Sequence, residues 1–360
     1  MPSFSRDTFL QIVANEKMGF SFGLPERIGE ESLSVVLPIL RETSIERQYV
    51  TLPEVQDQVE MSDTGSIEGM QVKNKTGKNL FIRSGTIFKG GTQERALMRS
   101  AVIFPEGKTV VKVRCVHRSK GINTGAKVGY GALTSLDFDQ LNYEKSFSPK
   151  DQSQYWSNVE KVSGRLARMA NVVHAADEGF SSIRHSHRPR SRSGLRSTSA
   201  SRGFMGSAGI ISTDTVYTDD YSSNLDHFAR TFDEVLRKVK LHENQAGLAL
   251  ITDKGCETIE FFDLPISWKA LHEDAIKRLG PNLVNKDMAN VFEYKPERAR
   301  ELVHQVLMKG YKQDVIYDHR PSNGEPAVTV IGLSTDGFTG EVVEIDGRVM
   351  HLSLFRLATS

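Results

Sequence analysis

The sequence predicts an α+β fold: one interlocked domain with a β-rich N-terminal half of antiparallel hairpins and a mixed helix and strand C-terminal half. Three observations lead to this prediction. Residues 1–148 contain short apolar runs divided by turn residues, which is typical of antiparallel strands. Residues 149–180 carry apolar residues three or four positions apart, as an amphipathic helix does. Residues 204–360 alternate between the two patterns and are expected to complete the same domain.

The composition is ordinary for a folded, water-soluble chain and excludes several classes of protein. With 46 Lys and Arg against 45 Asp and Glu, the net charge is +1, so the chain as a whole is not a basic nucleic-acid binder. No apolar run approaches the roughly 18 residues that a membrane helix needs, and the N-terminus lacks an apolar signal core. The 2 cysteines are too few for a disulfide framework. We therefore expect a cytoplasmic protein without a membrane partner.

Local signals place the elements of the first half. Apolar residues at helical spacing follow Ser5 and end at Gly19, which predicts a first helix. Thr51, Pro53 and Glu54 have the spacing of a capping box, which predicts that a second helix begins there. The expected strands lie at 33–40, 70–72, 80–82, 101–104 and 110–116, with hairpin loops at 74–78 and 105–108.

The middle of the chain changes composition abruptly. After the helix predicted over 149–180, residues 181–203 are rich in arginine and serine and contain no acidic residue, which predicts a disordered loop. One interpretation is an arm that neutralises the phosphates of a nucleic acid, and the other is a passive insertion. The arginines of this arm are Arg184, Arg188, Arg190, Arg192, Arg196 and Arg202.

The second half is expected to alternate helices and strands. Helices are predicted at 225–239, at 268–279 and from 296 to 310. The second of these is expected to stop at Gly280 and Pro281, since both residues interrupt helices. Strands are predicted at 246–251, 258–262, 328–333, 342–345 and 349–357, the last two joined by a turn at Asp346 and Gly347.

The loop at residues 85–95 is a candidate ligand site. Gly90 and Gly91 allow positive φ angles and a close approach of the backbone to a ligand. Lys89, Gln93 and Arg95 bring donors that suit a phosphate, a carboxylate or a base edge. The alternative is a sharp turn between two strands with internal ion pairs.

Three residues are weak candidates for catalysis. Period-two alternation puts Cys115 and His117 on one face of a strand, where the thiol is either a core residue or a nucleophile with His117 as its base. His351 lies within a predicted strand and is either a core histidine or a catalytic group. No spacing typical of a metal site occurs, so no metal is expected, and whether the protein uses a cofactor stays open.

Short segments of the chain, in order over about residues 30–357, match segments of one bacterial and archaeal family. The matching segments are Y-V-T-L-P-E at 49–54, G-S-I at 65–67, V-K-N at 72–74, G at 85 with G-G-T-Q-E-R at 90–95, V-R-C-V at 113–116, Q-A-G at 245–247, F-F-D-L-P at 261–265 and H-L-S-L-F at 351–355. By these segments the chain resembles the ADP-ribosylglycohydrolase and rhodanese-phosphatase superfamily-associated protein domain family. One departure is that the family usually has glutamate where this chain has His117.

The resemblance implies a place in nucleotide, ADP-ribose or RNA-end metabolism, such as RNA repair. It makes the loop of residues 89–95 the leading ligand site and adds Gln245 and Asp263 as weaker candidates. Three functions stay open: a module that binds a nucleotide, RNA end or other phosphate-bearing ligand, an enzyme acting on ADP-ribose or phosphoester substrates, and a structural or assembly protein. Self-association and partners encoded in the same operon also stay open.

Overall fold

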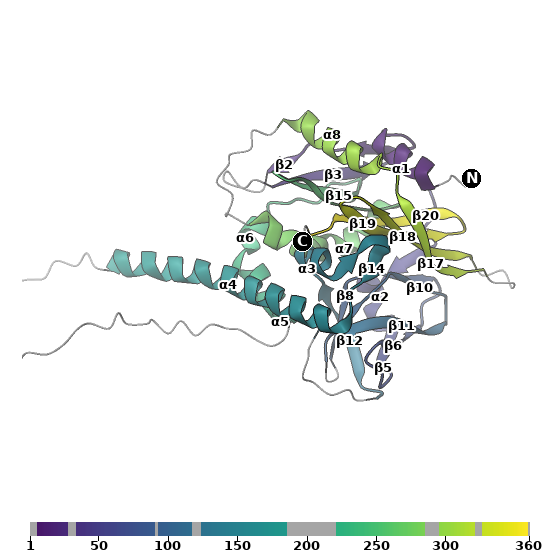
Figure 1. The fold of residues 1–360 in the computed structure, drawn as a ribbon, viewed down its shortest axis with the longest axis horizontal. Helices are drawn as coiled ribbons and strands as arrows, with labels where there is room; N and C mark the ends of the chain where they lie inside the picture. The colour runs from purple at the N-terminus through teal and green to yellow at the C-terminus, as the bar shows by residue number, and fades with distance from the viewer. Residues whose placement is uncertain are drawn as a thin grey trace, which may run out of the picture.

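A nine-stranded antiparallel sheet forms the centre of the fold (Figure 1). The computed structural model describes residues 6–27, 34–90, 93–116, 124–185, 221–284, 295–320 and 326–358, and the sheet is built from these. The strand order is β1-β3-β15-β16-β20-β19-β18-β17, and β2 pairs with the first part of β3. The strands are β1 (Phe20–Phe22), β2 (Glu26–Arg27), β3 (Val35–Arg41), β15 (Gln245–Thr252), β16 (Gly255–Phe262), β17 (Lys312–His319), β18 (Val328–Thr335), β19 (Phe338–Ile345) and β20 (Arg348–Arg356).

Both faces of this sheet are covered. On one face, Leu37 and Ile39 pack with residues of α1 (Arg6–Ala14) and α8 (Pro296–Leu307). On the other face, Val36 belongs to a cluster that contains Trp268 of α7 (Pro265–Leu283). A strand that is buried on both faces needs a continuous apolar run instead of alternation, which explains why β3 is apolar almost throughout.

The first half of the chain closes a six-stranded barrel below the sheet (Figure 1). Its interior is apolar, with Val72, Phe88 and Val113 among the buried residues. A small sheet of β4 (Tyr49–Thr51), β7 (Asn79–Ile82) and β10 (Ala101–Ile103) joins the barrel core to the core of the large sheet. The barrel strands, in spatial order, are β11 (Lys108–Cys115), β6 (Gly69–Asn74), β5 (Val59–Asp63), β12 (Lys127–Leu133), β8 (Thr86–Gly90) and β9 (Arg95–Leu97).

Two helices cover the outside of the barrel. Leu166 of α4 (Gln152–His185) packs with Leu225 and Phe228 of α5 (Tyr221–Thr231). The far part of α4 extends away from the rest of the molecule (Figure 1). No helix in the described part of the chain is long and apolar enough to cross a membrane. The short elements are α2 (Leu52–Val55), η1 (Gln56–Gln58), α3 (Leu136–Asn142), β13 (Tyr143–Glu144), η2 (Lys145–Phe147), β14 (Ser148–Pro149) and α6 (Asp233–Leu236).

The α+β prediction is confirmed, and several local signals are found where they were expected. Glu54 accepts a hydrogen bond from the backbone N–H of Thr51 at 2.8 Å, so α2 begins with the predicted capping box. Asp346 and Gly347 both have positive φ, as the tight turn between β19 and β20 requires. The helix α4 continues through His185, beyond the predicted loop boundary at 181, and the chain has no proline in this stretch that would interrupt a helix.

Two kinds of local prediction are wrong. The turns at 74–78 and 105–108 are not hairpin loops, since β6 and β11 pair within the barrel while β7 and β10 pair in the small sheet. The helix α7 also passes through Gly280 and Pro281 and ends at Leu283. The last turn of α7 is buried, and a Cβ on Gly280 would lie 2.7 Å from Phe228, so packing outweighs the local preference to stop.

Candidate functional site

The predicted ligand loop is the turn between β8 and β9 of the barrel, which pair with each other. Gly90 has φ near +105°, and a Cβ there would lie 3.1 Å from the carbonyl oxygen of Lys127. The glycine therefore allows close packing of the strands. Gly91 and Thr92 lie outside the described residues.

The guanidinium of Arg95 points into the protein. Its Nη2 lies 2.6 Å from the Asp63 carboxylate, and its Nη1 donates to the carbonyl oxygens of Ser66 and Gly69, each at 3.0 Å. The side chain is only about 3% exposed. Arg95 thus secures the loop between β5 and β6 at the barrel end and has no free face for a ligand.

The other polar residues of this loop connect the barrel to α5. Glu94 accepts hydrogen bonds from the backbone and hydroxyl of Ser222 in the first turn of α5. Lys89 forms an ion pair with Asp226 at 2.9 Å. Gln93 is half-buried, and its Oε1 has no hydrogen-bond partner among the described residues. The structure therefore does not gather Lys89, Gln93 and Arg95 around one open cavity.

A cleft of about 900 Å³ lies beside this loop, where Asp226 forms part of its wall. Residues of α5, α6 and α7 and of the segment following α6 surround it. Its floor is apolar: Ala229, Leu236, Val239 and Ile276 belong to the buried core.

The cleft is lined by more cations than acidic residues. Arg237 pairs with Asp233 at 2.9 Å, and Lys277 pairs with Glu273 at 3.0 Å. Two further lining cations, Arg230 and Lys240, form no ion pair with any residue that the structure describes.

His272 adds an uncharged polar group to the cleft wall. Burial disfavours the charged imidazole and lowers its pKa below the ordinary histidine value. Its Nδ1 is buried and has no hydrogen-bond partner within the described residues. A hydrogen bond with the backbone of Val239 partly offsets this effect of burial on the pKa.

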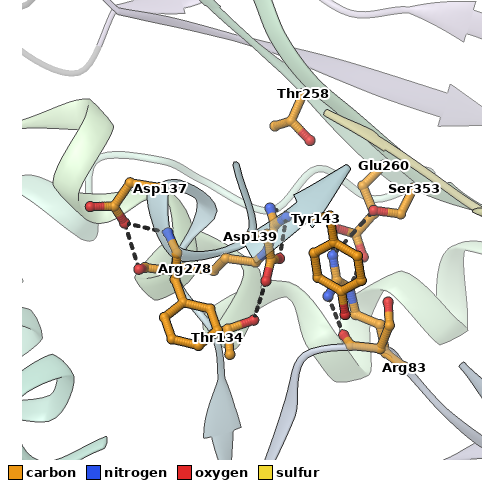
Figure 2. A network of polar contacts seen from close by, with 12 residues as sticks. Arg83, Thr134, Asp137, Asp139, Tyr143, Thr258, Glu260, Arg278 and Ser353 are labelled. Atoms are coloured by element: carbon orange, nitrogen blue, oxygen red, sulfur yellow. Dashed lines mark hydrogen bonds and ion pairs between the residues drawn. The ribbon is translucent and has the colours of Figure 1, made fainter. Parts of the chain in front are cut away.

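A second polar cluster lies inside the protein, where the large sheet, α3 and α7 meet (Figure 2). Arg83 donates hydrogen bonds to both carboxylate oxygens of Glu260, with an Nη2–Oε2 distance of 2.8 Å. Arg278 lies 3.0 Å from Asp139, whose second oxygen accepts a hydrogen bond from Thr134 at 2.7 Å. Each of these four charged side chains is 5% exposed or less.

Burial and ion pairing shift the pKa values of these carboxylates in opposite directions. Burial by itself would raise the pKa of Glu260, but the charge of Arg83 and hydrogen bonds from His351 and Arg83 hold that pKa well below its usual range. For Asp139, burial is the stronger effect and raises the pKa despite Arg278. The cluster is internal and closed to solvent.

His351 belongs to this closed cluster. Its Nε2 lies 3.2 Å from Glu260, and its ring packs between Phe81 and Phe262 at centroid distances of 5.1 and 4.6 Å. The residue has no exposed surface. The structure therefore places His351 in the core.

Cys115 lies at one end of the barrel and is also buried. Burial raises the pKa of its thiol, which disfavours the reactive thiolate. The side chains of Gln152 and Trp156 both donate to its carbonyl oxygen at 3.1 Å, which fixes the start of α4 against β11. His117 lies outside the described residues.

The two weaker candidates have structural partners. Gln245 bridges an irregularity of β15 by accepting from the backbone N–H of His242 and donating to the carbonyl of Gly247. Asp263 accepts a hydrogen bond from the Tyr49 hydroxyl at 2.6 Å and pairs with Arg348. Neither lines the large cleft.

Most of the predicted arginine arm lies outside the described residues. Arg184 is on α4, but its side chain is not among the described ones, and Arg188, Arg190, Arg192, Arg196 and Arg202 lie outside the described residues. Among the residues that are described, no group of three or more His, Cys, Asp or Glu side chains could hold a metal ion.

Sequence reasoning missed both the cleft and the buried cluster. A weak signal for the cluster exists, because Glu260 interrupts an otherwise apolar strand and Arg278 falls in the apolar part of a helix. A buried charge on an element predicted to be core needs a partner, although the sequence does not say which.

One comparison with known proteins gives a match. A family model, described as ARPP-1: ARG and Rhodanese-Phosphatase-superfamily-associated Protein domain, matches residues 26–355. No curated protein and no solved structure matches the chain significantly.

Proposed function

The chain belongs to the family of the ARG and Rhodanese-Phosphatase-superfamily-associated Protein domain, and we propose that it binds a phosphate-bearing small molecule of nucleotide size in the cleft between α5, α6 and α7. Arg230 and Lys240 contact the phosphate, and the apolar floor accepts the less polar part of the ligand. The observation that carries the proposal is the presence of these two lining cations without an ion-pair partner in the described residues.

The dimensions of the cleft support a small-molecule ligand. Binding pockets for such ligands typically measure about 300–1,000 Å³ and are lined by apolar residues with a few placed polar groups. The cleft measures about 900 Å³ and combines an apolar floor with charged walls. This mixture suits a ligand that has both a ring system and an anionic group.

The charges around the cleft favour an anion over a cation. The cleft is lined by the cations Arg230, Arg237, Lys240 and Lys277 and by the acids Asp226, Asp233 and Glu273. In addition, Lys89 of the barrel forms an ion pair with Asp226. All three acids are therefore already paired with a cation. A phosphate would give Arg230 and Lys240 the charge-assisted hydrogen bonds that they lack among the described residues.

Binding is favoured over catalysis by the positions of Cys115 and His351, the two candidate catalytic groups that the structure describes. Cys115 and His351 are both buried, and neither lines the cleft. The lining residue His272 has a lowered pKa, so it favours the neutral form and adds no charge to the cleft.

Calorimetric titration of the full chain tests this proposal. ADP-ribose, ADP and inorganic phosphate are the probes, and adenosine is the uncharged comparison. We expect saturable binding of at least one phosphate-bearing probe, weaker binding of adenosine, and a loss of about tenfold or more in affinity for Arg230→Ala with Lys240→Ala. Binding should also weaken with added salt, since the contact is between charges at a solvated cleft.

Arg298→Ala is the matched control, because Arg298 is an exposed helix arginine that pairs with Glu301 on α8, away from the cleft. This variant should bind as the wild type does. If none of the three phosphate-bearing probes binds, or if the double variant binds them with unchanged affinity, the cleft is not a phosphate site.

A further inference from the structure

One layer of the barrel wall faces solvent and is rich in lysine. The strands β11 and β12 each change partner along their length, so the start of β12, then β5, β6 and the start of β11 pair into one antiparallel layer. Alternate side chains of these strands point into the apolar barrel core, and the others point outward. Four of the outward side chains are lysines, and we call this surface the lysine face: Lys73, Lys108, Lys112 and Lys127.

The positive charge of the lysine face is not neutralised. None of its four lysines forms an ion pair with a residue that the structure describes. Glu60 is the one acidic residue on the outward side of the described layer, and it already pairs with Lys75. The hydrogen bond from Lys75, together with the charges of Lys75, Lys73 and Lys127, lowers the pKa of Glu60. Other acidic residues nearby lie beyond the ends of these strands, at Asp57, Glu68 and Glu106.

Two of the lysines repel each other across a strand pair. Lys108 lies directly opposite Lys73 in the register between β11 and β6. Like charges directly opposite each other destabilise a strand pair. Glu60 lies opposite Lys73 on its other side, but the carboxylate of Glu60 is also held by Lys75. An anion bound between Lys73 and Lys108 would remove the repulsion, so this pair of residues favours an anionic ligand.

We propose that the lysine face binds the phosphodiester backbone of a nucleic acid. Its lysines extend over roughly 14 Å both along and across the strands, given the rise per residue and the spacing between strands. This extent exceeds the size of one phosphate group and fits a chain that carries a charge on every unit. Ser62 and Gln71 lie among the lysines, and hydroxyl and amide side chains commonly bond the phosphate oxygens of nucleic acids.

The same features favour binding that does not depend on base sequence. No outward side chain of the described layer is aromatic, so a base has no ring on which to stack. Contacts with phosphates position a protein on a nucleic acid but carry no sequence information directly. A chain with a net charge of only +1 can bind in this way, because the attraction comes from a local group of lysines.

Other anionic partners suit this face less well. A membrane surface is usually bound by basic residues together with apolar side chains that enter the lipid. Val110 is the one large apolar side chain that points outward from the described layer, with 58% of its surface exposed. An acidic peptide carries carboxylates on only some of its residues, whereas every nucleotide brings a phosphate.

Fluorescence anisotropy with the full chain tests this proposal. The probes are a labelled single-stranded RNA and a single-stranded DNA of the same mixed sequence, each of roughly 16 nucleotides. We expect both to bind with similar affinity at about 50 mM salt, because both present phosphates, and to bind much more weakly at about 200 mM salt. Lys108→Gln with Lys112→Gln should weaken binding about tenfold at the lower salt concentration. This double variant should also reduce the slope of log K against log salt by about 0.7 for each lost phosphate contact.

Lys17→Gln with Lys254→Gln is the matched control, because it removes the same charge at two exposed lysines outside the barrel. This control should bind both probes as the wild type does. Melting curves show whether each variant folds. Since Lys108→Gln removes the repulsion with Lys73, it should not lower the melting temperature.

Any of three results would overturn the proposal. The first is a wild type that shows no saturable binding of either probe at the lower salt concentration. The second is a double variant of Lys108 and Lys112 with unchanged affinity and salt dependence. The third is binding of polyglutamate, or of vesicles that contain anionic lipid, as tight as that of the RNA. None of these results bears on the cleft, because Lys108 and Lys112 do not line it.

Discussion

Arg83 and Glu260 lie 177 positions apart in the chain, yet they form a two-point ion pair that solvent does not reach. Arg83 comes from the loop that follows β7, and Glu260 comes from the middle of the large sheet. Through Arg278 and Asp139 the same cluster extends to α7 and α3. These charges therefore hold the small sheet, the large sheet and two helices in one arrangement.

Breaking this pair on one side should be strongly destabilising. Glu260→Gln leaves the buried Arg83 without its counter-charge, which typically costs about 3–5 kcal/mol. Urea unfolding followed by circular dichroism measures the free energy of unfolding. The exposed Arg298→Leu is the comparison and should change this free energy by about 0.5 kcal/mol or less. A loss for Glu260→Gln as small as that of the comparison would show that the cluster does not stabilise the fold.

The same ion pair should make the free energy of unfolding depend on pH in the acidic range. Since the pKa of Glu260 is well below its usual range in the folded protein, the unfolded chain takes up this proton first as the pH falls. The stabilisation is complete above the ordinary glutamate pKa of about 4.3 and is lost as the pH falls towards the folded value. The difference in unfolding free energy between wild type and Glu260→Gln should therefore narrow between about pH 5 and pH 3. A difference that is constant over this range would contradict the assignment.

Arg95 and Lys89 should respond differently to the same substitution. Arg95→Ala removes a buried guanidinium that pairs with Asp63 and should cost about 3 kcal/mol or more. Lys89→Ala removes a partly exposed pair with Asp226 and should cost no more than about 1 kcal/mol. Thermal and urea unfolding of both variants measure this. Equal, small losses would mean that Arg95 is free to act at the surface, as the sequence-based prediction has it.

Both cysteines should be inert in the folded protein. Burial raises the pKa of Cys115, and burial raises the pKa of Cys256 to about 12. An aromatic disulfide reagent that reports free thiols should react slowly in native buffer and rapidly with both cysteines in denaturant. Rapid reaction of one thiol in the native protein, lost in Cys115→Ala, would return Cys115 to the list of candidate nucleophiles.

Local patterns in the sequence predict much of the secondary structure. Alternation along Val111, Val113 and Cys115 matches their burial inside the barrel, and Thr51 with Glu54 marks a real helix start. These signals depend on neighbours within a few residues. The pairing of strands could not be predicted in this way, because it depends on residues far apart in the sequence. For example, β3 lies beside β15, and the turns at 74–78 and 105–108 each connect strands of two different sheets.

The site was harder to predict for the same physical reason. Arg95 looks like a free cation in the sequence because its counter-charge, Asp63, is 32 positions away. Arg230 looks like a solvated residue of an ordinary helix and Lys240 like a residue just beyond a helix, and only the packing of α5, α6 and α7 makes them part of a cleft. Charge and glycine content can be read from a loop, whereas the identity of each partner depends on the tertiary fold.

The placement of β3 between β1 and β15 has a consequence for the way the chain is made. When a ribosome has produced only the first two hundred residues, the barrel strands already have their neighbours, but one side of β3 does not. That apolar strand must wait for β15, and the sheet is complete only after β20 joins β16 to β19. During this interval the nascent chain exposes one side of an apolar strand. We therefore expect N-terminal fragments of this protein to depend most on chaperones, which prevent aggregation.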